Sequence, residues 1–222
     1  MNKITVIAPH MDDEVLGCGG TIAKHVNRGD EVSVIIVARR AYNHHFDEET
    51  TAREKESARE AQKILGYQNL AFLDLDDELL DHKVQEIIIP LEKEVNKLRP
   101  NIVYTCNQHD INQDHKAVFT ASIIVCRPQI NIYMKKLYCY EVPSATDQIP
   151  AISQQGFTKS KYVNIEQYIE KKISAMKAYE KESRTYPHPR SPEGIIAYAR
   201  KRGTEVGYSY AESFHLLREL DD

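Results

Sequence analysis

Ile4-Thr-Val-Ile-Ala8 is a short, mostly apolar run that leads directly into His10-Met-Asp-Asp-Glu14. A continuous apolar run of this length is typical of a strand buried in a parallel sheet. The acidic turn that follows is predicted to lead into a helix over residues 18–27. Strand, polar turn and helix in this order form the first unit of an α/β fold.

The same alternation continues along the chain. Strands are predicted at residues 32–37, 70–73, 102–105, 137–140 and 162–165, and helices at 18–27, 50–65, 84–98, 115–125, 165–179 and from 192. Pro90 is expected to kink or restart the helix that contains it. No composition shift or repeat marks a second domain. The sequence therefore predicts one α/β domain over residues 1–222, with an open, mostly parallel sheet and helices on both faces.

Composition narrows the class of protein. The chain has 29 basic and 33 acidic residues, a net charge of −4, which argues against a nucleic-acid binder. The longest apolar stretch, residues 32–38, is far shorter than the roughly 20 residues that span a bilayer. We expect no secretion signal and a cytoplasmic location. The four cysteines show no C-x-x-C pair, so neither a zinc ribbon nor a disulfide framework is predicted.

Two polar clusters each follow a predicted strand. His10, Asp12 and Asp13 come after the first strand, and His115 opens the helix after the strand at 102–105. In open parallel sheets, ligands bind beyond the carboxyl ends of the strands. Imidazole and carboxylate are ligands that zinc prefers, and a catalytic site uses three of them. We therefore predict a zinc site made by His10, Asp13 and His115, with Asp12 as the base that activates water.

Each of these residues also has an ordinary interpretation. His10 could be a loop histidine, and Asp12, Asp13 and Glu14 could be acids that favour a helix start. The case rests on two complementary clusters at strand ends. A run of three nearby glycines is expected to let substrate approach the backbone and to leave amide groups free: Gly17, Gly19 and Gly20.

Ala8-Pro-His-Met-Asp-Asp-Glu14 resembles the signature of the PIG-L or LmbE-like family of zinc-dependent de-N-acetylases, whose usual form is Ala-His-Pro-Asp-Asp-Glu. Arg53 to Gly66, Asp114-His115 and Arg190-Ser-Pro-Glu193 are similar to later family motifs. The resemblance implies a Rossmann-like sheet. It also implies zinc-dependent hydrolysis of an N-acetyl group on an amino sugar or a sugar-containing metabolite, with release of acetate.

The resemblance also implies roles for individual residues. Arg53, Asp76 and Arg190 would bind substrate, although Arg53 could equally be a solvated charge on its helix, and Asp114 is placed with the catalytic residues. One position departs from the family: many relatives have histidine where this chain has Asn112. Asparagine can donate a hydrogen bond to an oxyanion but cannot transfer a proton. The proton for the leaving amine would then come from Asp12 or from His188.

Two other functions compete with this interpretation. One is a Rossmann-like transferase whose acids hold magnesium, although magnesium rarely uses histidine ligands. The other is an inert sugar-binding module of the same fold. Residues 159–202 hold 11 basic and 5 acidic residues, which leaves a sugar phosphate, sugar nucleotide or glycoconjugate open as substrate. A homo-oligomer is also left open.

Overall fold

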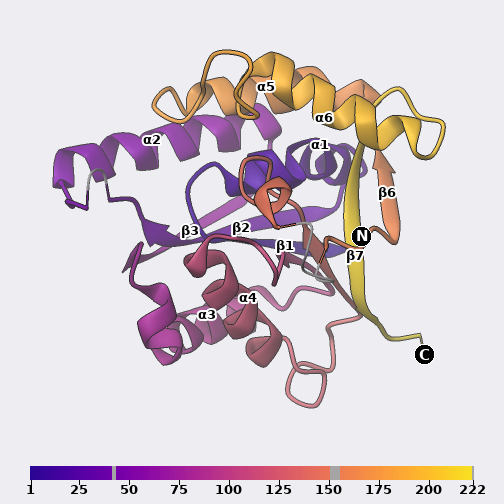
Figure 1. The fold of residues 1–222 in the computed structure, drawn as a ribbon. Coiled ribbons are helices and arrows are strands. Elements are labelled where there is room, and N and C mark those ends of the chain that lie inside the picture. Colours follow the sequence, from indigo (N-terminus) through magenta and orange to yellow (C-terminus); the bar gives the residue numbers. More distant parts are fainter. Residues whose placement is uncertain (42–43, 151–155, 222) are drawn as a thin grey trace.

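The strands form one mixed sheet in the computed structural model, which describes residues 1–41, 44–150 and 156–221. The order across these described strands is β3-β2-β1-β4-β5-β7-β6 (Figure 1). The strands span Lys3–Ala8 (β1), Glu31–Arg39 (β2), Asn69–Asp76 (β3), Ile102–Cys106 (β4), Lys136–Tyr140 (β5), Lys161–Asn164 (β6) and Ala211–Glu219 (β7). The first five run parallel, and β7 is antiparallel to both of its neighbours.

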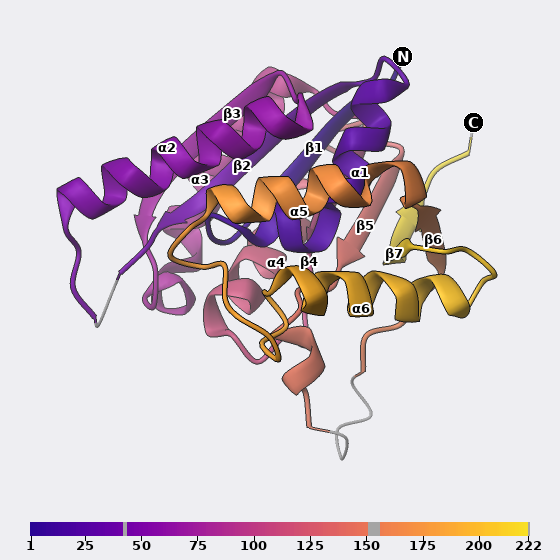
Figure 2. The same ribbon diagram turned by 90° about the horizontal axis from the view of Figure 1, so that it is seen from above.

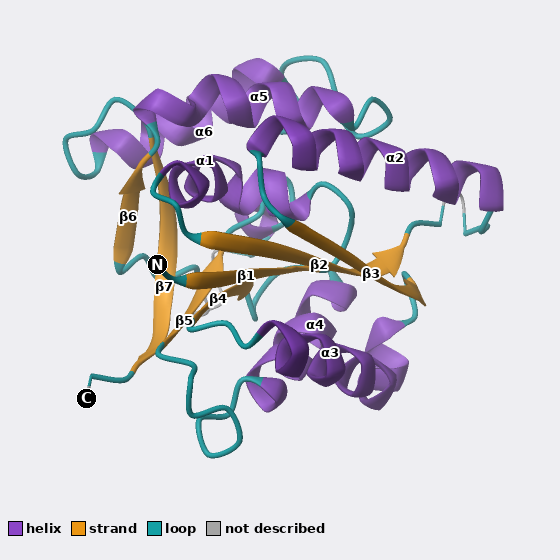
Figure 3. Ribbon diagram, turned by 180° about the vertical axis from the view of Figure 1, so that it is seen from behind, coloured by secondary structure: helices purple, strands orange, loops and turns teal. Residues whose placement is uncertain are grey.

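Helices cover both faces of the sheet. One layer contains α1, α2, α5 and α6, and the opposite layer contains α3 and α4 (Figures 1 and 3). Seen from above, α5 passes over α1 and runs beside α2 (Figure 2). The helices span Asp13–Asn27 (α1), Glu48–Leu65 (α2), Val84–Leu98 (α3), Gln113–Val125 (α4), Ile169–Ala178 (α5) and Pro192–Thr204 (α6). None of the described helices is long and apolar enough to cross a membrane.

The chain reverses direction across the sheet between β1 and β4. From β1 the strands proceed outward through β2 to β3, and from β4 they proceed the other way to β5. Such a switch point leaves a crevice at the carboxyl ends of the two central strands. Both polar clusters of the sequence follow these two strands, so the topology brings together residues about a hundred positions apart.

The predicted fold class is confirmed, but three elements differ from the prediction. Helix α1 begins at Asp13 rather than at residue 18, because the acidic residues of its first turn interact favourably with the helix dipole. Helix α3 continues through Pro90 without a restart. Strand β7 was not predicted, because Ala211–Glu219 mixes polar and apolar residues without regular alternation.

The glycines of α1 serve packing, not substrate. A Cβ atom on Gly17 would lie 2.2 Å from the ring of Tyr140, and one on Gly20 would lie 2.7 Å from Ile165. The expectation of free amide groups is also wrong. Glu212 of β7 accepts hydrogen bonds from the amides of Gly20 (2.9 Å) and Thr21 (2.7 Å).

Glu212 forms a buried ion pair with Lys172 of α5 at 2.6 Å, and we call this pair the helix clasp. The ammonium group of Lys172 also donates to the carbonyl oxygen of Leu16 at 2.8 Å. In a regular α-helix that carbonyl would accept from the amide of Gly20. Lys172 thus pairs with the carbonyl of Leu16, and Glu212 pairs with the amide of Gly20. These contacts connect α5 and β7 to α1.

Candidate metal centre

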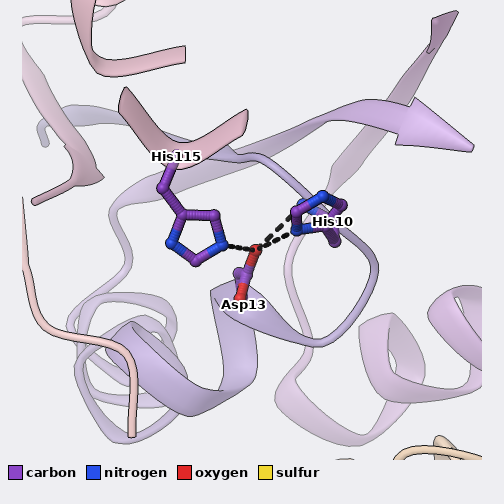
Figure 4. Close-up of side chains that lie close together, drawn as sticks. All are labelled: His10, Asp13 and His115. Carbon is purple, nitrogen blue, oxygen red and sulfur yellow. Dashed lines mark hydrogen bonds and ion pairs between the residues drawn. The ribbon is translucent and has the colours of Figure 1, made fainter. Parts of the chain in front are cut away.

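Three potential metal ligands converge at the switch point. His10 and Asp13 come from the turn between β1 and α1, and His115 comes from the first turn of α4. One ligand atom from each lies within 4.8 Å of the other two, and all three residues are buried. Nδ1 of His10 and Nε2 of His115 each lie 3.2 Å from the same carboxylate oxygen of Asp13, as Figure 4 shows. Two imidazoles and one carboxylate facing one point match the donor set of a catalytic zinc site.

A second carboxylate holds each imidazole from behind. Asp114 lies 3.1 Å from Nε2 of His10, and Asp110 lies 2.9 Å from Nδ1 of His115. Metal-bound histidines commonly donate their remaining N–H in this way, which fixes the tautomer and the direction of the ring. Asp114 also accepts hydrogen bonds from the amides of Glu78 and Leu80. Asp114 thus contacts the ring of His10 and is itself held by two backbone amides. Asp110 was not predicted, because nothing in its local sequence distinguishes it.

The electrostatics of the described residues suit a cation. Burial lowers the pKa of His115, but Asp13 and Asp110 outweigh burial and raise this pKa to about 10. Burial opposes ionisation of Asp13, yet His115 and His10 hold its pKa well below the usual range. The cluster thus holds an ionised carboxylate between two proton-binding imidazoles. A divalent metal ligated here must displace protons from the imidazoles, because ligand nitrogens are deprotonated.

Asp12 lies beside this cluster in an unusual backbone conformation. Its φ of 115° is rare for a residue with a side chain, and its amide donates to the Glu14 carboxylate at 3.2 Å. The Asp12 carboxylate is fully buried and accepts from Arg40 at 3.2 Å and from Arg190 at 2.9 Å. Burial raises the pKa of Asp12 to about 6, against the opposing effect of Arg190 and Arg40. A carboxyl group with a raised pKa is a stronger proton acceptor than an ordinary aspartate.

A cavity of about 520 Å³ opens next to these residues. His10 and His115 form part of its wall, together with charged groups from both halves of the chain. The described lining residues are His10, Arg40, Ala41, Asp77, Glu78, Ile111, Asn112, Gln113, Asp114, His115, Ser144, Ala145, Glu182, Arg184 and Arg190. The cavity is large enough for a sugar-sized ligand.

Two of the predicted substrate residues do not line this cavity. Arg53 is exposed on α2, where its guanidinium donates to the hydroxyl of Thr50 at 3.4 Å. Asp76, the last residue of β3, accepts from Arg39 at 2.6 Å. Asp77, which follows Asp76, and Arg40, which follows Arg39, line the cavity instead. The side chains of successive residues in an extended chain point to opposite sides. The ion pair of Arg39 and Asp76 therefore faces away from the cavity, while the residues that follow them face it.

Arg190 and Asn112 do line the cavity, whereas His188 does not. The side-chain oxygen of Asn112 caps α4 by accepting from the amide of Asp114 at 2.8 Å. His188 is half-buried, and its Nδ1 accepts from the amide of Arg190 at 3.1 Å. Burial and the nearby Arg190 lower the pKa of His188. The structure therefore places His188 behind Arg190, where it supports the loop.

The chain is similar to known proteins over most of its length. The profile of the PIG-L family, described as GlcNAc-PI de-N-acetylase, matches residues 5–126. The uncharacterized deacetylase YaiS of Escherichia coli (strain K12) is 27% identical over 181 residues, which are 79% of this chain and 89% of YaiS.

Two solved structures show the same fold. The N,N'-diacetylchitobiose deacetylase of Pyrococcus horikoshii has a TM-score of 0.77 at 21% identity, over 98% of this chain and 84% of that chain. The 4-carboxy-2-hydroxymuconate hydratase GalB of Pseudomonas putida KT2440 also has a TM-score of 0.77, at 19% identity, over 100% and 98%. Because a deacetylase and a hydratase share it, the fold alone does not determine the reaction.

Proposed function

We propose that this chain, which belongs to the PIG-L family of GlcNAc-PI de-N-acetylases, is a zinc-dependent hydrolase of N-acetylated amino sugars or sugar-containing metabolites. Family membership supports the deacetylase activity itself, as the sequence predicted. Zinc, the individual residue roles and the nature of the sugar are our proposal. The observation that carries it is the convergence of His10, Asp13 and His115 next to the buried Asp12, with His10 and His115 at the wall of a cavity.

When bound, zinc would polarise the acetyl carbonyl and make a nearby water more acidic. Asp12 accepts the proton of that water as the water oxygen adds to the carbonyl carbon. Asn112 lines the cavity, and its amide group is suited to donate a hydrogen bond to the developing oxyanion. Asp110 and Asp114 hold the two imidazoles in place. Cleavage of the C–N bond then yields acetate and a free amine.

The leaving nitrogen needs a proton, and we assign its delivery to Asp12. Asp12 carries a proton after it has activated water, and it is the neighbour in the chain of the ligand Asp13. His188 is less suitable, because its Nδ1 accepts from the backbone of Arg190, whereas Asp12 is adjacent to the ligand Asp13 and contacts Arg40 and Arg190 of the cavity wall. One carboxylate would thus act first as base and then as acid.

The proposal is tested by incubating purified protein with a panel of N-acetylated sugars, sugar phosphates, sugar nucleotides and glycoconjugates. We expect acetate and free amine in equal amounts from at least one member, and loss of this activity on chelation with recovery on adding zinc. Failure of zinc-loaded protein to release acetate from any member would favour an inert sugar-binding module. Activity that requires magnesium and a phosphorylated donor would favour the transferase.

The remaining expectations stay predictions. We expect the substrate to be a small molecule or glycan and the location to be the cytoplasm. Whether the chain forms a homo-oligomer can be measured by sedimentation.

A further inference from the structure

Asp12 belongs to a closed ring of four buried or half-buried charged side chains, which we call the carboxylate–arginine ring: Asp12, Arg40, Glu182 and Arg190. Asp12 comes from the turn after β1, and Arg40 follows β2. Glu182 and Arg190 come from the segment between α5 and α6, outside the residues that the family profile matches. The ring therefore ties a late segment of the chain to the motif at its beginning.

Glu182 contacts both arginines more closely than Asp12 does. It accepts from Arg40 at 2.7 Å and from Arg190 at 2.5 Å, whereas the Asp12 contacts are 3.2 Å and 2.9 Å. Its side chain is 3% exposed. A buried carboxylate with two guanidinium partners is a strong, directional anchor. Glu182 thus contacts both arginines, which are also held by Ser144, accepting from Arg190 at 3.0 Å, and by the carbonyl of Met11, accepting from Arg40 at 3.3 Å.

We propose that Glu182 is a positioning residue for Asp12. It holds Arg40 and Arg190, at the wall of the cavity, against the Asp12 carboxylate, so that the two guanidinium groups fix the orientation of this buried carboxylate beside the ligand cluster. This inference rests on the proposed function only for the role of Asp12 as base. The energetic coupling between Asp12 and Glu182, through the two arginines, is a property of the fold.

The arrangement explains why Asp12 needs such support. Its backbone is in a strained left-handed conformation, and two guanidinium groups lie beside it. Without Glu182, the two half-buried guanidinium groups would lose the carboxylate that contacts both of them most closely, and they would move apart or draw Asp12 toward one of them. Small displacements of a catalytic group are costly, because about 1 Å of misplacement can reduce turnover about a hundredfold.

Kinetics of Glu182→Gln provide the main test, with Glu180→Gln as the matched control. Glu180 is an exposed carboxylate two positions away on the same segment. We expect Glu182→Gln to lower kcat about tenfold to a hundredfold while KM stays within about twofold and zinc content is unchanged. The control should leave all three unchanged. If Glu182→Gln does not fold, Glu182→Asp keeps the charge, withdraws the carboxylate by one carbon, and should show the same separation of kcat from KM.

A double-mutant cycle identifies the route of the effect. In an Asp12→Asn background, Glu182→Gln should cause no further loss of kcat, because the residue that it positions is already disabled. An equal loss in both backgrounds, or a rise in KM with kcat unchanged, would overturn the proposal.

A stability cycle separates this inference from the proposed function. The shifts in melting temperature for Asp12→Asn and Glu182→Gln should be non-additive, whereas those for Asp12→Asn and Glu180→Gln should add. Coupled stabilities without acetate release from any substrate would refute the proposed function and leave the coupling intact. Activity with additive stabilities would refute the coupling and leave the function intact.

Discussion

The molecule contains two buried charged clusters that meet different parts of α1. The proposed metal centre, made by His10, Asp13 and His115, lies at the start of this helix. The helix clasp, made by Lys172 and Glu212, meets its middle. Both are almost inaccessible to solvent. They differ in what their polar atoms face: the clasp is closed by backbone groups of α1, whereas the ligand cluster borders a cavity of about 520 Å³.

The difference shows that burial of charge does not by itself mark a functional site. In the clasp, opposite charges and backbone groups satisfy one another, and the space that Lys172 and Glu212 help to line is only about 20 Å³. In the metal centre, both imidazoles face one oxygen of Asp13, and second carboxylates hold them there. Two imidazoles and a carboxylate that converge on one point beside a cavity form a donor set that a metal ion can take.

The largest effect is expected from removing a ligand. His115→Ala should abolish zinc binding and acetate release together, because two ligands are too few for a catalytic zinc site. His82→Ala removes an imidazole whose side chain is 70% exposed, and it should change neither property. Metal analysis and an acetate assay on the same preparation provide the measurement. Full zinc occupancy in His115→Ala would show that the ligand assignment is wrong.

Asp12→Asn separates the base from the ligands. We expect a fall in kcat of roughly 10² to 10⁴ with zinc retained, since a positioned base contributes about this much. Asp81→Asn, at a more exposed carboxylate, serves as the control. If Asp12→Asn loses its zinc, Asp12 is a ligand rather than the base.

The clasp should respond in stability and not in chemistry. Lys172→Met leaves the Glu212 charge buried without its cation, which should cost about 3–5 kcal/mol. For a chain of this size, that corresponds to a fall in melting temperature of about 6–20 °C. Turnover per folded molecule should stay at the wild-type value. Lys171→Met, at the exposed neighbour, should leave the melting temperature nearly unchanged.

Removing both charges of the clasp refines this expectation. In Lys172→Met with Glu212→Leu, the carbonyl of Leu16 and the amide of Gly20 can pair with each other as in a regular helix. We therefore expect a smaller loss of stability than the sum of the single changes. Strictly additive losses of stability would mean that the carbonyl of Leu16 and the amide of Gly20 do not compensate for the missing charges by pairing with each other.

Asp110→Ala should weaken the metal centre without destroying it. Loss of the carboxylate behind a ligating histidine typically reduces metal affinity about 10–100-fold. Competition with a chelator of known affinity would measure this change, and Gln108→Ala at a nearby exposed residue is the control. An unchanged zinc affinity would mean that the contact between Asp110 and His115 does not orient the ring.

The smallest effect is expected at His188. Because it supports the loop behind Arg190, His188→Ala should change turnover only a few-fold and leave the pH–rate profile intact. A strong fall in turnover together with loss of the basic limb would instead identify His188 as the general acid.

The sequence by itself determined the fold class and the set of proposed ligands. Alternating apolar strands and amphipathic helices specify an open parallel sheet, since each pattern buries its apolar face in only one way. His10 and Asp13 are close along the chain, and His115 follows a second strand end, so strand order alone predicts their meeting. The family signature covers the same residues.

The tertiary structure alone decided the surroundings of these ligands. Arg40, Glu182 and Arg190 come from three strand or helix ends with no common spacing, and Asp110 has no local motif. Arg53 and Asp76, which were expected to bind substrate, do not line the cavity. For Asp76, a shift of one residue along extended chain reverses the side that a side chain faces, whereas Arg53 is an exposed residue of helix α2. The glycines of α1 were misassigned because their partners, Tyr140, Ile165 and Glu212, are more than a hundred residues away. Local pattern specifies which elements form, whereas contacts between distant segments specify what each side chain meets.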